Sequence, residues 1–302
     1  MLRLEARAKI NWTLDIIGVR EDGYHLMDML MSSVALADIL ELEAAVDLSL
    51  SVTGEYAAEA NGKAGSMPPF RDNLIWRAAN ALQKATGCQM GAVMRLDKRI
   101  PVGAGMGGGS ADAAAALIGL NRLWELSLPL ADLRAIGLSL GADVPFALTG
   151  GLARVRGIGE EIEPLPFPTT HWIVGIQPCG GLSTPDIFCA FDSLPGERVL
   201  HPQTDTAQAA MLAGDMPMLF TAMGNVLEAV SLGKRPEMRI AIQDLIRHGA
   251  ARAIMTGSGS VVYGIFEDET KARGAYDELR ARWSRSFVTP TAADPVVLIS
   301  GV

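Results

Sequence analysis

The sequence is poor in the residue types that build disulfide frameworks and zinc sites. Its 302 residues include three cysteines, Cys88, Cys179 and Cys189, and no two of them have C-x-x-C spacing. An odd number of widely spaced cysteines argues against a disulfide framework and fits a reducing cytosol. The four histidines form no H-x-x-x-H pair, which also argues against a zinc site.

Positive charge and long apolar runs are scarce as well. Lys and Arg total 26 against 34 Asp and Glu, which gives a formal net charge of −8. A chain this acidic is not expected to bind nucleic acid, and any anionic ligand has to be held by local groups. No apolar run approaches a membrane span, and the N-terminal MLRLEARAKINW lacks the apolar core of a signal peptide. We therefore expect a cytoplasmic protein with no membrane partner.

The chain does contain enough apolar residues to build two cores. Hydrophobic residues make up 49% of its length, and 302 residues suit two domains that share a cleft. The stretch 152–168 is rich in Gly and Pro, so we place the domain boundary there, with domains at 1–160 and 161–302. We expect a monomer or a weak homodimer.

Hydrophobic periodicity predicts an α+β protein. Alternation of apolar and polar residues predicts strands at 1–17, 39–52, 92–96, 172–176, 253–255, 261–266 and near Phe287. Helical spacing predicts helices at 72–86, after Ser110, and at 130–140, 207–230 (broken near Pro217), 238–247 and 269–283. Residues 20–23 and 54–71 are expected to be loops. The C-terminal order of helix, two strands, helix and strand predicts a ferredoxin-like domain.

Several residues are predicted to define helix ends. Asp72 is expected to cap the helix at 72–86, and Gly87 to end it in the left-handed conformation. Ser110 is expected to cap the helix after the glycine-rich segment. Pro145 is expected to prevent the helix at 130–140 from continuing.

A glycine-rich loop is the strongest functional signal. Apart from Ala104, every residue from 103 to 109 is Gly or Met. Glycine is costly to order, so such a cluster indicates a backbone that approaches a ligand closely. Because a helix follows, the loop offers free N–H groups and the positive end of a helix dipole, which form an anion site. A plain flexible turn is the weaker alternative, since turns rarely contain this many glycines.

Three well-known phosphate-binding loops do not fit this segment. Gly103, Gly105 and Gly108 match G-x-G-x-x-G, but a dinucleotide-binding loop would follow a buried parallel strand directly. Neither Lys63 nor Lys234, each preceded by Gly, is followed by the Ser or Thr of a Walker A motif. The H-R-D and D-F-G motifs of protein kinases do not follow either. A different type of ATP-binding loop is left.

The loop and its companions resemble the GHMP kinases, the family that includes galactokinase, homoserine kinase and mevalonate kinase. The family's Pro-x-x-x-Gly-Leu-Gly-Ser-Ser-Ala-like loop is matched by residues 101–111, with Met106 for the usual Leu. Its second glycine loop is matched by 256–260 and its N-terminal motif by 8–11. Ala111 stands where members of the family often have a second Ser.

Two further segments narrow the resemblance. Arg20-Glu21-Asp22-Gly23-Tyr24-His25 and Gly141-Ala142-Asp143-Val144-Pro145-Phe146 are similar to those of family members in the non-mevalonate isoprenoid pathway. The resemblance covers nearly the whole chain. It implies a two-domain GHMP kinase fold, ATP as phosphoryl donor, Mg²⁺ arriving with ATP and no metal site of the protein's own. The implied acceptor is a cytidine diphosphate-linked methylerythritol. The implied ATP-binding residues are Pro101, Val102, Gly103, Ala104, Gly105, Met106, Gly107, Gly108, Gly109, Ser110 and Ala111.

The resemblance implies two catalytic residues. Asp143 is the candidate general base, because a kinase has to orient the attacking hydroxyl and accept its proton. Lys9 is its candidate partner, because an ammonium group favours the alkoxide and offsets charge on the transferred phosphoryl group. A solvated turn aspartate and a surface lysine on an edge strand are the alternatives.

Five residues are candidates for binding the acceptor. Asn11 shares a strand face with Lys9, which would let it contact the same substrate. By resemblance, Tyr24 and His25 read cytidine, Phe188 stacks on the other face of the base and Thr184 supplies a polar contact. Core packing is the alternative for Phe188, and a loop histidine bonded to backbone is the alternative for His25.

Two functions remain as rivals. One is a GHMP kinase for another alcohol, against which Gly23-Tyr24-His25 argues. The other is a catalytically silent nucleotide-binding protein, against which the presence of both Lys9 and Asp143 argues. Ser258 and its glycines are expected to border the nucleotide, to form a tight hairpin, or both.

Overall fold

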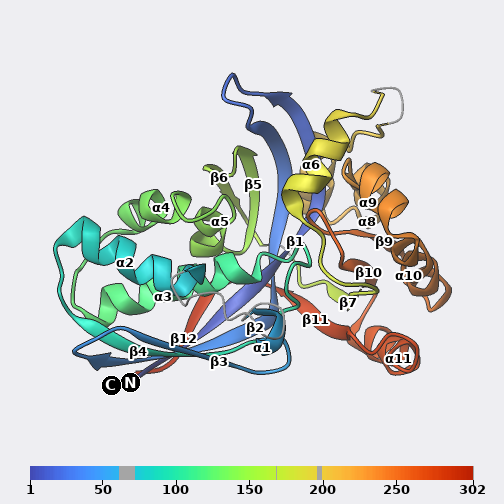
Figure 1. Cartoon of the computed structure of the whole chain (residues 1–302). Helices are drawn as coiled ribbons and strands as arrows, with labels where there is room; N and C mark the ends of the chain where they lie inside the picture. Colours follow the sequence, from blue (N-terminus) through green and yellow to red (C-terminus); the bar gives the residue numbers. More distant parts are fainter. Residues whose placement is uncertain (61–71, 168, 196–198, 302) are drawn as a thin grey trace.

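Two long antiparallel strands run through the whole molecule (Figure 1). The structure is a computed structural model that describes residues 1–60, 72–167, 169–195 and 199–301. Strand β1 (Leu2–Val19) pairs with β2 (His25–Ala45) from Leu2 opposite Leu42 to Val19 opposite His25. The predicted turn at 20–23 joins them, and the Arg20 N–H donates to the Tyr24 carbonyl at 2.7 Å. The resulting hairpin projects beyond the body of the molecule.

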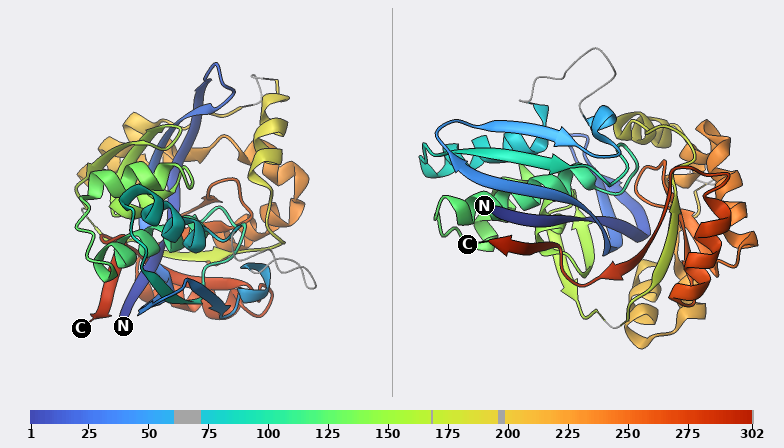
Figure 2. Two further views of the ribbon diagram at one scale, coloured as in Figure 1. Left: turned by 60° about the vertical axis from the view of Figure 1, so that its left-hand side comes forward. Right: turned by 90° about the horizontal axis from the view of Figure 1, so that it is seen from below.

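The N-terminal half is a sheet with helices on one face (Figure 2). β2 also pairs with β4 and β5, which in turn pair with β3 and β6, and β12 pairs with β1. These strands are β3 (Ser49–Thr53), β4 (Gly91–Asp97), β5 (Leu152–Gly157), β6 (Glu161–Leu165) and β12 (Val296–Gly301). The helices are α1 (Ala57–Ala60), α2 (Leu74–Thr86), α3 (Gly108–Leu123), α4 (Leu130–Leu138) and α5 (Val144–Thr149). Alanines of α3 pack on leucines of β1 and β2 and form the first core.

The C-terminal half confirms the predicted ferredoxin-like domain. Its strands are antiparallel in the order β11-β7-β10-β9, which is the ferredoxin-like arrangement. They are β7 (Trp172–Ile176), β9 (Arg252–Met255), β10 (Val262–Phe266) and β11 (Ser286–Ala292). The remaining elements are α6 (Thr184–Asp192), α7 (Thr204–Ala213), α8 (Met216–Ala222), β8 (Gly224–Asn225), α9 (Glu228–Lys234), α10 (Pro236–Arg247) and α11 (Glu269–Leu279).

The segment predicted as a domain boundary is a strand hairpin. β5 and β6 lie within 152–168 and pair with each other, because Leu152, Ala153 and Val155 are buried apolar residues. The glycines that suggested a linker lie at the strand ends. The division into 1–160 and 161–302 stays a prediction. Strand β12 follows the C-terminal half in the sequence but pairs with β1 in the N-terminal sheet.

Two of the predicted helix caps were wrong, by one residue and by three residues. Asn73, not Asp72, caps α2, because its extended backbone lets its carboxamide oxygen accept from the Ile75 N–H at 2.9 Å. Gly87 ends this helix with φ 73°, as predicted. Helix α3 begins at Gly108 after Gly107 with φ 67°, so Ser110 lies in its first turn and does not cap it.

Prolines begin helices here where the sequence suggested interruptions. Pro145 lies in the first turn of α5, and Pro217 lies in the first turn of α8. Proline fits the first turn because the N–H groups there have no intrahelical partner. Most of the predicted loop at 54–71 falls on residues 61–71, outside the described part of the chain.

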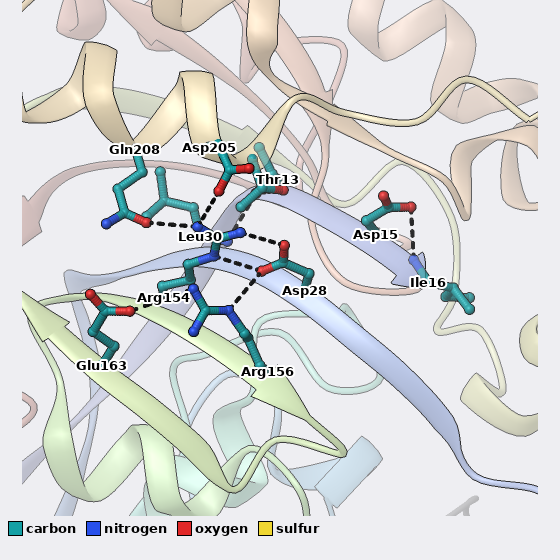
Figure 3. Close-up of polar contacts among 11 residues, drawn as sticks. Thr13, Asp15, Ile16, Asp28, Leu30, Arg154, Arg156, Glu163, Asp205 and Gln208 are labelled. Atoms are coloured by element: carbon teal, nitrogen blue, oxygen red, sulfur yellow. Dashed lines mark hydrogen bonds and ion pairs between the residues drawn. The ribbon is translucent and has the colours of Figure 1, made fainter. Parts of the chain in front are cut away.

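An arginine joins the two halves of the molecule (Figure 3). Arg154 of β5 donates to both carboxylate oxygens of Asp28 on β2, at 2.8 and 2.7 Å. It also donates to Asp205 of α7 at 2.5 Å and to Gln208 of α7 at 3.2 Å. A bidentate arginine fixes the angle between the groups it joins, so this contact holds α7 against the N-terminal sheet.

Candidate active site

A cavity of about 880 Å³ brings most of the predicted site residues together. It is bordered by the glycine loop, the β1–β2 hairpin, α6 and the second glycine loop. The predicted site residues that line it are Lys9, Tyr24, His25, residues 101–110, Asp143, Thr184 and Phe188. Ala111 and Asn11 do not line it. Ala111 belongs to the first hydrophobic core, and Asn11 is fully buried.

The glycine loop has a backbone that only glycine adopts easily. Gly103, Gly105 and Gly107 have φ of 63°, 77° and 67°, the left-handed region. A Cβ on Gly105 would lie 2.1 Å from the carbonyl oxygen of Thr256, so the two glycine loops touch through their backbones. The glycines therefore serve both conformation and close packing, and a plain flexible turn does not describe them.

Backbone hydrogen bonds attach this loop to three other segments. The N–H of Lys9 donates to the Met106 carbonyl at 3.0 Å. The N–H of Val261 donates to Ala104 at 3.1 Å, and that of Leu182 donates to Gly103 at 3.2 Å. The loop is thus attached to β1, to the second glycine loop and to the segment before α6.

The start of α3 lines the cavity and has the features of an anion site. Gly108, Gly109 and Ser110 are in the first turn and line the cavity. N–H groups in a first helical turn have no intrahelical partner, and the helix dipole places positive charge there. Such a site suits the phosphates of a nucleotide, which the protein's net negative charge would otherwise repel.

Lys9 and Asp143 face each other beside Gly107. The Lys9 Nζ lies 3.9 Å from Asp143 Oδ2, and a Cβ on Gly107 would lie within 3.5 Å of both side chains. Lys9 is 6% exposed, which is not the environment of a surface lysine. Burial lowers the pKa of Lys9, and the carboxylate of Asp143 partly opposes this. Asp143 precedes α5 without bonding to its N–H groups, so its carboxylate stays available to the cavity.

Aromatic side chains line the same cavity. The rings of His25 and Phe188 are 4.8 Å apart with a 40° interplanar angle. The Nε2 of His25 is 2.7 Å from Asp192 Oδ1, so this histidine bonds to a carboxylate. Phe188 also packs against the second core, so both of its predicted environments are present. Tyr24 is 61% exposed at the hairpin tip.

Thr184 connects α6 to the second glycine loop. Its hydroxyl lies 2.9 Å from the hydroxyl of Ser258, and both residues line the cavity. The loop joins β9 to β10, so Ser258 borders the cavity and belongs to a tight hairpin at the same time. The hairpin expected at Ser258 is therefore present, and its contact with the nucleotide stays a prediction.

Sequence reasoning missed a buried charge network beneath the glycine loop. The Lys98 Nζ donates to Asp38 and, at 2.7 Å, to Asp112 Oδ2. Asp38 also accepts from the N–H groups of Arg99, at 2.5 Å, and Ile100, at 2.8 Å. The network therefore joins β2, the entrance of the loop and α3. A signal was present, since Asp112 interrupts a run of alanines in α3.

Burial and mutual proximity shift the pKa of two members of this network, Asp112 and Lys98. Burial raises the pKa of Asp112 well above its usual value, with Lys98 opposing this and Asp38 adding to it. Burial also acts to lower the pKa of Lys98, but the carboxylates of Asp112 and Asp38 outweigh it and the pKa is raised. Among the described residues, one oxygen of Asp112 has no hydrogen-bond partner.

Within the described ranges, no three His, Cys, Asp or Glu side chains gather into a possible metal site. The same part of the chain holds no helix with the length and apolar character that crossing a membrane requires. Cys88, Cys179 and Cys189 are free.

Comparison with known proteins identifies the family. The profile described as "GHMP kinases N terminal domain" matches residues 73–151, and "GHMP kinases C terminal" matches 207–285. A protein of Pelotomaculum thermopropionicum named 4-diphosphocytidyl-2-C-methyl-D-erythritol kinase is 42% identical over 292 residues. The match covers 95% of this chain and 96% of the relative.

Solved structures agree with this match. A crystal structure of 4-(cytidine 5'-diphospho)-2C-methyl-D-erythritol kinase superposes with a TM-score of 0.79 at 32% identity. The match covers 97% of this chain and 100% of that one. Homoserine kinase from Cytophaga hutchinsonii shares the fold, with a TM-score of 0.73 at 18% identity and coverage of 99% and 97%.

Proposed function

Because this chain belongs to the GHMP kinase family, we propose that it phosphorylates the 2-hydroxyl of 4-diphosphocytidyl-2-C-methyl-D-erythritol with ATP. The products are the 2-phosphate and ADP. Relatives named 4-diphosphocytidyl-2-C-methyl-D-erythritol kinase match nearly the whole chain. One observation carries the proposal further: a single cavity holds an anion site, a Lys–Asp pair and a His–Phe aromatic pair.

Each part of the cavity then has a role. The ATP phosphates lie on residues 101–111, where N–H groups at the start of α3 offset their charge. The cytosine base stacks on Phe188, with Tyr24 and His25 around it and Thr184 as a polar contact. With the phosphates and the base in these positions, the polyol would lie between Phe188 and the glycine loop. Its 2-hydroxyl would lie at Lys9 and Asp143.

Transfer to the hydroxyl needs a base and a counter-charge. Asp143 accepts the proton of the 2-hydroxyl as the oxygen attacks the γ-phosphorus, and the bond to the ADP oxygen breaks. The Lys9 ammonium stabilises the developing alkoxide and the charge on the transferred group. Its burial strengthens this interaction, because a low dielectric weakens screening.

We expect Mg²⁺ to arrive with the nucleotide. Since the described side chains offer no carboxylate cage, phosphate oxygens and water would be its main ligands. Bound there, it would neutralise phosphate charge. A cytoplasmic monomer or weak homodimer, with no nucleic-acid or membrane partner, remains our expectation; the free cysteines support the location.

Turnover of the cytidyl substrate tests the proposal. The purified chain with ATP and Mg²⁺ is given the cytidyl polyol, mevalonate and homoserine in turn, and ADP and the phosphorylated product are measured. We expect phosphorylation of the cytidyl polyol alone. Phosphorylation of mevalonate or homoserine instead would show that the proposed acceptor is wrong. ATP binding without phosphorylation of any of the three alcohols would favour a catalytically silent nucleotide-binding protein.

Asp143→Asn tests the base. We expect it to reduce kcat at least about a hundredfold, the scale of a positioned general base. Asp132→Asn, at an exposed site on α4, is the matched control and should keep full activity. Unchanged turnover by Asp143→Asn would remove this residue from the mechanism.

A further inference from the structure

Asn11 has no access to the cavity, although it is a neighbour of Lys9 on β1. Its side chain is completely buried, and it is not among the residues that line the cavity. The carboxamide oxygen accepts from Lys9 Nζ at 2.7 Å, from the Gly257 N–H at 3.0 Å and from the Thr256 hydroxyl at 3.2 Å. All three are contacts within the protein.

The donors around this carboxamide determine its orientation. The Lys9 ammonium and the Gly257 N–H can only donate, so both require an oxygen. A flipped carboxamide would direct its NH₂ group at both of them. The Asn11 backbone is held too, since its N–H donates to Thr256 Oγ1 at 3.2 Å and its carbonyl accepts from the Tyr263 hydroxyl at 2.8 Å.

The hydrogen bond to Asn11 sets the distance between Lys9 and Asp143. Lys9 is buried and Asp143 is 37% exposed at the cavity, and these opposite charges attract, yet the ammonium lies 2.7 Å from the Asn11 oxygen and 3.9 Å from the Asp143 carboxylate. A direct hydrogen bond from Lys9 would stabilise the charged form of Asp143 and make it a weaker base. It would also occupy the carboxylate that has to accept the proton of the hydroxyl.

We infer that Asn11 is a positioning residue, which ties Lys9 to the second glycine loop and thereby keeps its ammonium out of direct contact with Asp143. This inference rests on the proposed kinase activity and gives Asn11 a role different from the substrate contact predicted from the sequence. It also gives the second glycine loop a role in catalysis. A Cβ on Gly257 would lie 2.6 Å from the Gly105 carbonyl oxygen, so the loop that holds Asn11 also packs on the nucleotide loop.

A double-mutant cycle with Lys9 distinguishes positioning from substrate contact. Asn11→Leu keeps the same branching pattern and has no acceptor oxygen, and Asn11→Asp keeps an acceptor. We expect Asn11→Leu to lower kcat at least about tenfold, with KM for ATP and for the cytidyl polyol within about twofold. Asn11→Asp should keep more activity than Asn11→Leu. In a Lys9→Met background, Asn11→Leu should cause no further loss.

The outcomes that would overturn the inference are distinct. A rise in the polyol KM, with an equal loss in the Lys9→Met background, would show that Asn11 contacts the substrate. Thermal unfolding reports whether each variant folds. Should Asn11→Leu not fold, Asn11→Asp completes the cycle: its effect on kcat has to vanish without Lys9. Should the wild type use another alcohol, the cycle is run with that alcohol, so the two proposals fail separately.

Discussion

The Nζ of Lys9 and the Oδ2 of Asp143 lie 3.9 Å apart, beyond hydrogen-bond reach, on the same side of Gly107. A separation of this size leaves the carboxylate able to accept a proton and the ammonium able to meet a developing negative charge. It also leaves a buried lysine whose ion pair, at 3.9 Å, does not fully offset the loss of its hydration, which costs stability. The activity and the stability of the protein are therefore expected to respond in opposite directions when Lys9 is changed.

Lys9→Met is predicted to lower activity strongly, to a residual rate that can still be measured, and to stabilise the fold. We expect kcat to fall at least about a hundredfold, because the counter-charge to the alkoxide is lost. Burial lowers the pKa of Lys9 in the folded protein, so the charged form destabilises the fold at neutral pH. This cost disappears as pH rises through the lowered pKa towards the usual 10.5. The unfolding temperature of Lys9→Met should exceed that of the wild type at pH 7, and this difference should shrink towards pH 10.5. A difference that grows with pH would contradict the prediction.

Gly107→Ala is predicted to impair catalysis beyond its backbone strain. A Cβ there would lie 3.1 Å from Lys9 Cγ, so the lysine has to move. Gly214→Ala is the control, since Gly214 has a similar φ of 72° and no atom within 4 Å of the added Cβ. Both variants should lose about 1 kcal/mol of unfolding free energy. Only Gly107→Ala should lose kcat, about tenfold or more, and equal kinetics for the two would refute the packing argument.

Phe188→Ala is predicted to weaken binding of the cytidyl substrate. Stacking of a base on an aromatic ring contributes about 1–3 kcal/mol, so we expect KM for this substrate to rise about tenfold. KM for ATP should stay within about twofold. Phe191→Ala is the control, because Phe191 is on the same helix and packs on the same core without lining the cavity. A similar KM for both variants would assign Phe188 to core packing alone.

Asp112→Asn is predicted to stabilise the protein above acidic pH. The network holds two carboxylates and one ammonium, so removing one carboxylate leaves a balanced pair, and the Asn oxygen can still accept from Lys98. Burial raises the pKa of Asp112 above its usual 3.8. The cost of ionising it in the fold is absent below pH 3.8 and grows as pH rises to the raised pKa.

Thermal unfolding as a function of pH tests this sign. The unfolding temperatures of Asp112→Asn and wild type should coincide near pH 3.8 and diverge towards pH 8, with the variant higher. Asp132→Asn, an exposed change of the same kind, should follow the wild type throughout. A variant that is less stable at pH 8 would show that the charge of Asp112 stabilises the network.

Most elements could be predicted from local pattern, and the errors share a cause. Apolar spacing predicted α10, β4 and β7 nearly to the residue. The segment 26–38 of β2 was not predicted, because it is buried on both sides and shows little alternation. α5 and α6 were missed because each is short, and proline in a first turn resembles a break.

The sequence by itself determined the family, the glycine loop and the residue types of the candidate site, since these depend on motifs whose spacing survives without coordinates. Tertiary structure alone decided which side chains share an environment. Lys98, Asp38 and Asp112 come from three elements, and Asn11 meets Gly257 across 246 positions of sequence. Periodicity describes one element at a time, whereas burial, a perturbed pKa and a hydrogen bond between distant residues arise only when elements pack.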